Sequence, residues 1–84
     1  MPYSVYIKQS AEKELDRLPS KVQDTITKKL TSLGENPLPK GAKKLQAKEG
    51  YRIRVGDYRI LYTVDDQRRV VRVYRIKHRR EVYG

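Results

Sequence analysis

The chain has 84 residues, 37% hydrophobic and 36% charged, with no cysteine and one histidine, which predicts a single domain over residues 1–84 with no buried cofactor and no metal site. No apolar run approaches the roughly 20 residues that cross a bilayer, and the N-terminus lacks the apolar run of a signal peptide, so we expect a cytoplasmic protein without a membrane partner. Twenty Lys and Arg against ten Asp and Glu give a net charge of +10. Most of this charge lies in residues 40–84, which contain fourteen basic and five acidic residues. The excess favours a polyanionic partner over a basic surface that only keeps the protein soluble.

The first half of the chain predicts a strand followed by two helices. Apolar and polar side chains alternate over residues 3–7, as in a strand with one buried face. Ser10 then precedes acidic residues that oppose the positive end of a helix dipole, so we expect Ser10 to be the N-cap of a helix. Pro19 and Ser20 interrupt that helix, and Gly34 is expected to end a second one. The two helices should form a hairpin.

The second half predicts three antiparallel strands. Residues 40–48 read as a basic loop, after which the hydrophobic period changes to two. Strands are expected over residues 51–55, 58–64 and 70–76, with tight turns between them, and residues 77–84 are too few for another packed element. The fold class is therefore α+β: an N-terminal strand, a two-helix hairpin and a three-stranded antiparallel meander, with the helices on one face of the sheet.

Alternation also predicts which side chains face the helices. Burying guanidinium groups under the helices would cost several kcal/mol apiece, so Arg52 and Arg54 must face solvent, and Arg59 of the next strand joins them. Residues 70–76 do not alternate cleanly enough for their faces to be assigned. The residues expected to form one core with the helices are Leu15, Ile26, Leu30, Tyr51, Ile53, Ile60 and Tyr62.

An open sheet face that carries guanidinium groups, with tyrosines nearby, is suited to phosphates and exposed bases. The same pattern also fits the ordinary solvated side of an antiparallel sheet. The C-terminal tail adds residue types that metal-free RNA cleavage needs, namely a base for the 2′-OH, cations for the phosphorane oxygens and an acid for the leaving oxygen. Tyr83 could be the base or a stacking platform, and Arg79 or His78 could assist the leaving oxygen. A tail that only packs would leave a non-catalytic RNA-binding module.

Two motifs, residues 51–62 and residues 78–83, resemble the RelE/ParE superfamily of toxins from bacterial and archaeal toxin–antitoxin pairs. The similarity spans the whole chain and is greater to the RelE branch, whose members cut mRNA in the ribosomal A site, than to the ParE branch, which acts on DNA gyrase. It implies a four-stranded antiparallel sheet with an N-terminal helix pair. It also implies a metal-independent mRNA endoribonuclease that inhibits translation and is neutralised by an acidic antitoxin protein. A gyrase-inhibiting toxin and a non-catalytic RNA-binding module are the alternatives.

The resemblance further implies roles for individual residues. Arg52 and Arg54 stand where RelE-type toxins place paired basic residues, and Arg59 stands where the family has an arginine that contacts the phosphate. Tyr83 matches the tyrosine that acts as base or stacks on the mRNA.

Arg79 matches the arginine that stabilises the transition state or protonates the leaving group, and Lys77 takes that place if the tail aligns two residues earlier. Other basic residues are expected to bind RNA, the first three of them on the ribosome: Lys43, Lys44, Lys48, Lys77, His78 and Arg80.

Overall fold

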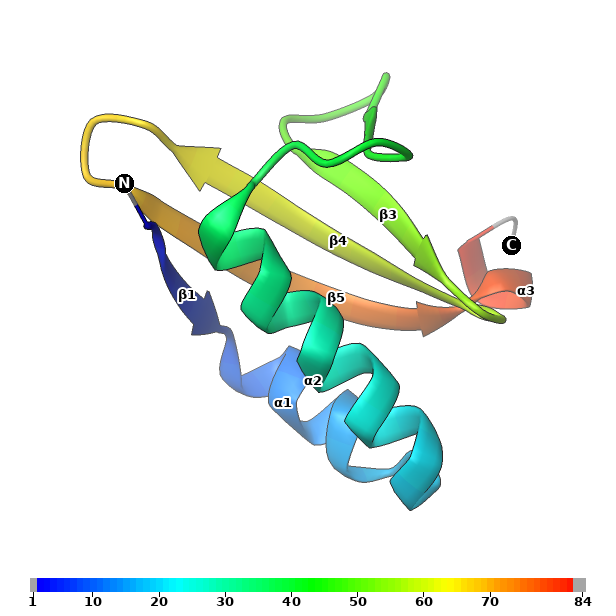
Figure 1. Ribbon diagram of the computed structural model, residues 1–84. Coiled ribbons are helices and arrows are strands. Elements are labelled where there is room, and N and C mark those ends of the chain that lie inside the picture. Colours follow the sequence, from blue (N-terminus) through cyan, green and yellow to red (C-terminus); the bar gives the residue numbers. More distant parts are fainter. Residues whose placement is uncertain (1, 83–84) are drawn as a thin grey trace.

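The helices α1 and α2 cover one face of a five-stranded sheet in the computed structural model, which describes residues 2–82 (Figure 1). The strand order is β1-β5-β4-β3-β2, and the predicted α+β class with its meander of β3, β4 and β5 is confirmed. The elements in chain order are β1 (Ser4–Ile7), α1 (Gln9–Asp16), α2 (Ser20–Glu35), β2 (Lys43–Lys44), β3 (Tyr51–Val55), β4 (Tyr58–Asp65), β5 (Val70–His78) and α3 (Arg79–Val82).

The sheet differs from the expected four-stranded antiparallel sheet in two respects. β1 pairs with β5 in parallel, and the basic loop contains the edge strand β2, which pairs antiparallel with β3. The Leu45 N–H donates to the Gly50 carbonyl across 2.9 Å, and this bond closes the loop so that β2 and β3 run side by side. Two residues of pairing leave too short a pattern to recognise in the sequence.

The first helix begins at Gln9, so the prediction that Ser10 is its N-cap is wrong. Lys8 still belongs to the sheet through its N–H, which donates to Val73 O across 2.8 Å, while its carbonyl already accepts from Glu12 N across 2.9 Å. The chain therefore passes from strand to helix at one residue, and Ser10 falls inside the first turn.

Gly34 does not end the second helix, which continues to Glu35. The residue is buried where α2 meets the start of β1, and its carbonyl accepts a 2.6 Å hydrogen bond from Tyr3 N. A Cβ at this position would lie 3.0 Å from Tyr3 O. The glycine is therefore explained by the close approach of the two backbones.

The predicted core lies between the helices and the sheet. Ile53, Ile60 and Tyr62 are buried together with Ile26 and Leu30 of α2, and Leu15 and Tyr51 pack against them half-buried. The prediction of a single core on this face is confirmed. The arginines of β3 and β4 consequently lie on the other face, which we call the open face.

A β-bulge resolves the irregular pattern of β5. Val73 and Ile76 both belong to the core although they are three positions apart, an odd offset that would place them on opposite faces of a regular strand. The register with β4 shifts between them and leaves Tyr74 as an extra residue. The bulge reverses the alternation for the rest of the strand. Lys77 thereby pairs directly with Arg59.

Glu14 of α1 holds the bulged segment. Its Oε1 accepts from the Ile76 N–H across 2.8 Å, and its Oε2 accepts from Nε and NH2 of Arg75 across 3.2 and 3.1 Å. The carboxylate thus satisfies a backbone donor that faces α1 and draws the Arg75 guanidinium to that helix.

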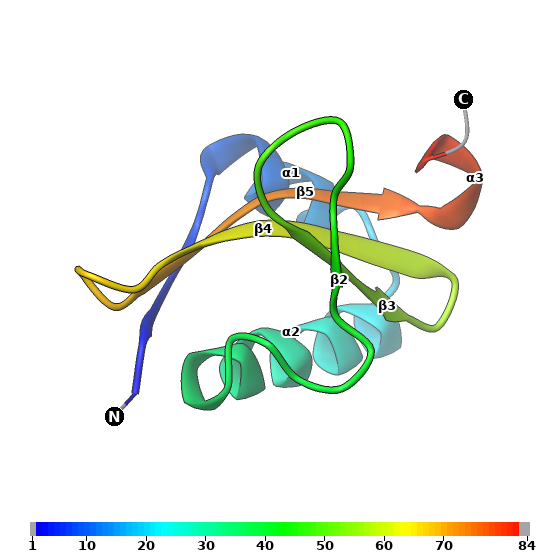
Figure 2. The ribbon, with the colours of Figure 1, turned by 90° about the horizontal axis from the view of Figure 1, so that it is seen from above.

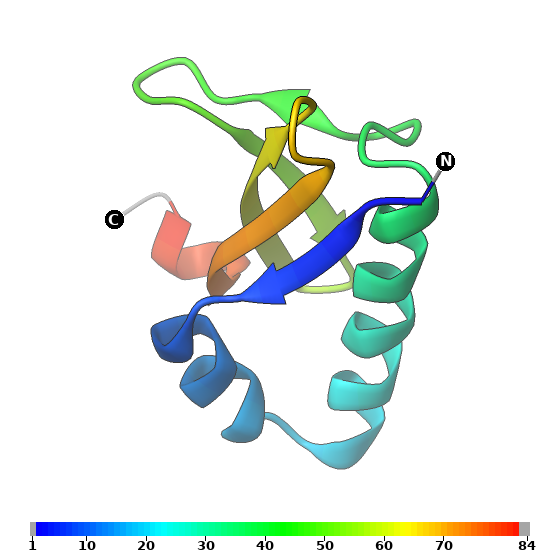
Figure 3. The same cartoon turned by 90° about the vertical axis from the view of Figure 1, so that its left-hand side faces the viewer.

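The C-terminal tail forms the short helix α3, contrary to the expectation that it is too short for a packed element. The Arg79 N–H donates to Asp57 O across 2.7 Å, which attaches α3 to the β3–β4 turn. Two views show α3 on the side of the sheet away from α2 (Figures 2 and 3). Among residues 2–82, no helix combines the length and the hydrophobicity that a membrane span needs.

Candidate nucleic-acid interface

A row of cations crosses the open face near the β3–β4 turn. Arg54 of β3 pairs with Arg59 of β4, and Arg59 pairs with Lys77 of β5. Directly opposed residues of an antiparallel pair have Cβ atoms only about 4.5–5.5 Å apart, and like charges at such positions are destabilising. The sheet therefore aligns three basic side chains on the open face.

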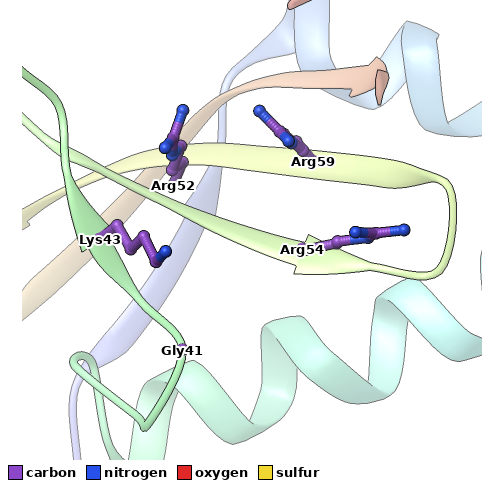
Figure 4. A pocket seen from close by; sticks show the side chains of 5 residues that line it. All are labelled: Gly41, Lys43, Arg52, Arg54 and Arg59. Atoms are coloured by element: carbon purple, nitrogen blue, oxygen red, sulfur yellow. The ribbon is translucent and has the colours of Figure 1, made fainter. Parts of the chain in front are cut away.

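A second row lies two residues further along the strands, where Lys43 pairs with Arg52 and Arg52 with Leu61. Four basic members of the two rows, without Lys77, surround a hollow of about 170 Å³, and β2 forms one wall of it (Figure 4). The residues that line it are Gly41, Lys43, Arg52, Arg54 and Arg59.

The three arginines of the hollow are held differently. The side chains of Arg52 and Arg59 rise from neighbouring strands on the same side of the sheet, and both residues are half-buried (Figure 4). Arg54 is exposed and lies toward the turn, where its Nε donates to Gly56 O across 2.9 Å. Arg52 and Arg59 are therefore the pair best placed to grip one phosphate group.

Two arginines that do not line the hollow form ion pairs with carboxylates. The ion pairs between described residues are Glu14 with Arg75 and Asp57 with Arg79, the latter at 3.9 Å. In the part of the chain that the structure describes, Lys43, Arg52 and Lys77 form no ion pair with a carboxylate. Among the side chains that the structure describes, no group of three or more His, Asp or Glu could hold a metal ion. The hollow is suited to an anion.

The tail residues separate into two groups. Arg79 and Arg80 are exposed on α3 next to the β3–β4 turn. His78 instead pairs with Tyr58 on the helix-covered face, where the two rings meet edge to face with centroids 5.3 Å apart. The structure therefore does not bring His78 together with Arg59. Tyr83 lies outside the described residues.

The predicted RNA-binding lysines lie around β2. Lys43 faces the same side as Arg52, whereas Lys44 pairs with Tyr51 of the helix-covered face. Lys48 stands in the loop 45–50, which we call the strap and which projects over the open face (Figures 2 and 3). Its Nζ lies 5.6 Å from the centroid of the Tyr74 ring. Lys43 and Lys48 thus approach the open face from two sides.

The sequence did not single out Tyr74 or Leu61 as part of this surface. Leu61 is only 6% exposed although it shares the face of Arg59, and neither residue belongs to the helix-covered core. Together they add an apolar floor next to the cations. The signal for Tyr74 was the change of alternation along β5, which a bulge explains.

Cations beside an apolar floor, on the uncovered face of a small basic sheet, form a surface suited to an anionic ligand. Comparison with known proteins identifies the family of the chain. The family model described as the ParE toxin of type II toxin–antitoxin system, parDE, matches residues 5–83. Toxin RelG of Mycobacterium tuberculosis is 31% identical over 85 residues, which cover 99% of this chain and 98% of that protein. A putative RelE-like toxin protein of Escherichia coli is 31% identical over 88 residues, covering 100% and 93%.

Solved structures of RelE toxins support the same family. A chain of the toxin–antitoxin complex RelBE2 from M. tuberculosis matches with a TM-score of 0.83 at 30% identity, covering 93% of this chain and 99% of that chain. The isolated E. coli RelE toxin matches with a TM-score of 0.79 at 32% identity, covering 96% and 90%. The chain belongs to the RelE/ParE superfamily of type II toxins and is a RelE-like toxin of a toxin–antitoxin system. The predicted membership is confirmed.

Proposed function

We propose that this toxin is an endoribonuclease that cleaves mRNA in the ribosomal A site, in the cytoplasm, and thereby inhibits translation. The observation that carries the proposal is the convergence of Arg52, Arg54 and Arg59 on one hollow of the open face. The RelE-like names of the relatives favour this branch of the superfamily.

In the proposed reaction the 2′-OH of the mRNA attacks the adjacent phosphate and expels the 5′ oxygen. Negative charge builds on the phosphorane oxygens, and Arg59 stabilises it with Arg52 and Arg54 beside it. The products are a 2′,3′-cyclic phosphate, which can open to a 3′-phosphate, and a 5′-OH. No metal-activated water takes part.

The proton transfers are assigned to the tail. Tyr83 takes the proton of the 2′-OH or stacks on the mRNA, and Arg79 or Lys77 stabilises the transition state or donates a proton to the leaving 5′ oxygen. The pairing of Lys77 with Arg59 supports Lys77 as a phosphate contact. Arg79 is held at the β3–β4 turn, where its N–H donates to Asp57 O across 2.7 Å and its Nε lies 3.9 Å from the Asp57 carboxylate.

Two macromolecular partners follow from this proposal. An acidic antitoxin segment covers the cationic face or displaces α3, and this would make association fast and salt-dependent. Relatives of known structure were solved as toxin–antitoxin complexes, which supports such a partner. On the ribosome, Lys43 and Lys44 bind ribosomal RNA, Lys48 binds an RNA phosphate, and His78 and Arg80 add contacts at the tail.

The proposal is tested by replacing Arg59 with alanine and measuring mRNA cleavage in a translation extract. A contact made as charge builds on the phosphate typically contributes about 100-fold or more in rate, so cleavage should fall by at least that factor while ribosome binding survives. Arg68→Ala is the matched control, because it removes the same charge from the exposed β4–β5 turn. Full cleavage by the Arg59 variant contradicts the proposal.

The alternative is a gyrase-directed toxin, which the match to the ParE family model favours. This function does not need the hollow. Toxicity that survives Arg59→Ala with intact mRNA, together with inhibited gyrase, would establish the alternative instead.

A further inference from the structure

Tyr74 lies on the open face because of the β5 bulge. It is the extra residue of the register shift, and it is half-buried without belonging to the helix-covered core. Leu61, the partner of the next residue along β5, is buried on the same side of the sheet. An aromatic ring and an aliphatic side chain therefore make an apolar patch among the cations.

The Tyr74 hydroxyl is the polar group of this patch. Its oxygen is buried, and within residues 2–82 no group forms a hydrogen bond with it. Buried polar atoms without partners are uncommon and require an explanation. Burial also raises the pKa of this phenol above its usual value, so the hydroxyl stays neutral and able to donate.

The strap approaches this patch through Lys48. Its root is fixed, because Leu45 N bonds to Gly50 O and because Gly50 has a φ of +116° with room for no side chain: a Cβ there would lie 2.6 Å from Tyr62 O. Its tip carries Lys48, whose ammonium lies over the Tyr74 ring. A hollow of about 340 Å³ separates the strap from Arg52.

We propose that Tyr74, Leu61 and Lys48 form a subsite for one unpaired nucleobase of the bound RNA. The base stacks on the Tyr74 ring in the place of the Lys48 ammonium, and Lys48 transfers to a phosphate of the same strand. The Tyr74 hydroxyl, which lies in the plane of its ring, donates to an acceptor atom of the neighbouring nucleotide. Arg52 pairs with Leu61 of this subsite and also lines the hollow of Arg59, so one strand can occupy both. The inference rests on the proposed RNA-binding function of the open face.

Aromatic stacking suits this position chemically. Every base has a π-face, so that a tyrosine platform accepts any base. An ammonium over the same ring is bound weakly by cation–π attraction at an exposed site. Exchanging the ammonium for a base leaves the cation free to pair with phosphate, which is the stronger contact.

Equilibrium binding of a single-stranded RNA hexamer with 2′-O-methyl riboses tests the subsite, because this RNA cannot be cleaved through its 2′-OH. Tyr74→Leu keeps the apolar bulk and removes the ring, and it should weaken binding by about 10-fold, the size of one lost base–aromatic stack. Tyr74→Phe keeps the ring and should retain affinity within about 3-fold. Lys48→Ala should reduce the slope of log affinity against log salt by about one, whereas Lys28→Ala, on exposed α2, should not.

Hexamers that carry one abasic residue at each position in turn separate stacking from other effects. At one position, the loss of the base should weaken wild-type binding and leave Tyr74→Leu unchanged. The chain contains no tryptophan, so Tyr74→Trp supplies a single emission signal that RNA with all its bases should quench and the matching abasic RNA should not. This second variant reports on stacking directly if Tyr74→Leu folds poorly.

Several results overturn the inference. They are equal binding by Tyr74→Leu and the wild type, equal loss on every abasic hexamer, and Tyr74→Trp emission that RNA leaves unchanged. A Tyr74 variant that weakens only antitoxin binding would assign the patch to a protein partner instead. None of these measurements requires cleavage, so the subsite can stand or fall independently of the proposed reaction.

Discussion

The contact between α1 and the β5 bulge predicts a large difference between two substitutions of Glu14. Glu14→Ala removes the acceptor of the Ile76 N–H and the partner of Arg75. A backbone donor bonded to a carboxylate contributes about 1.5–3 kcal/mol, and a partly exposed ion pair adds about 0–1 kcal/mol. We therefore expect a loss of roughly 2–3 kcal/mol, which lowers the melting temperature of a chain this size by about 10–20 °C.

Glu14→Gln separates the two contributions, because its amide oxygen can still accept from Ile76 N while the charge is lost. It should cost only about 1 kcal/mol, or roughly 4–8 °C. Thermal unfolding followed by circular dichroism measures both variants. Glu12→Ala, on the exposed first turn of the same helix, is the control and should cost at most about 1 kcal/mol.

Hydrogen exchange at the Ile76 amide should accelerate in Glu14→Ala and stay slow in Glu14→Gln, because only the first variant frees that donor. Because the bulge sets the pairing of Lys77 with Arg59, Glu14→Ala should also weaken RNA binding. The reasoning is refuted if glutamine is as harmful as alanine, or if Glu14→Ala is no more harmful than the Glu12 control.

Three further predictions concern stability. Gly50→Ala should unfold the protein at a clearly lower temperature than Gly41→Ala, because both glycines have positive φ but only a Cβ at Gly50 meets backbone; equal melting temperatures would contradict this. Burial raises the pKa of Tyr62 to about 12, so its neutral form stabilises the fold below pH 10 and that stabilisation is lost as the pH rises toward 12. The free energy of unfolding, measured with urea, should therefore decrease less between pH 10 and pH 12 in Tyr62→Phe than in the wild type. An equal decrease in both proteins would show that Tyr62 does not cause this pH dependence. Inorganic phosphate should raise the melting temperature more than chloride at equal ionic strength, and Arg59→Ala should remove the difference.

The faces of β3 and β4 could be predicted from the sequence because desolvation leaves only one choice. A strand that alternates isoleucine with arginine must bury the isoleucine, so Ile53 and Ile60 define the core and Arg52, Arg54 and Arg59 the open face. The helix pair was predictable for the same reason, from the apolar face of each helix. Both predictions use local sequence patterns, and both depend on the large free-energy difference between burying an apolar and burying a charged side chain.

The features that could not be predicted from the sequence depend on contacts between segments that are distant along the chain. The bulge at Tyr74 is stabilised by Glu14, 60 positions earlier in the chain, and Gly34 is explained only by the approach of β1. The strand β2 pairs through two residues, and α3 depends on a bond to Asp57. None of these features could be predicted without the three-dimensional structure. The roles of Arg59 and of Tyr83 stay predictions.

The central claim is that the hollow around Arg59 cleaves ribosome-bound mRNA. It is tested most directly by mapping the ends of mRNA fragments from a translation extract that receives the purified toxin, with the same RNA free of ribosomes as control. We predict cleavage within the codon in the A site, 5′-OH ends and 2′,3′-cyclic phosphate or 3′-phosphate ends, and intact free RNA. Intact mRNA on stalled ribosomes, or fragments that begin with a 5′-phosphate, would contradict the account.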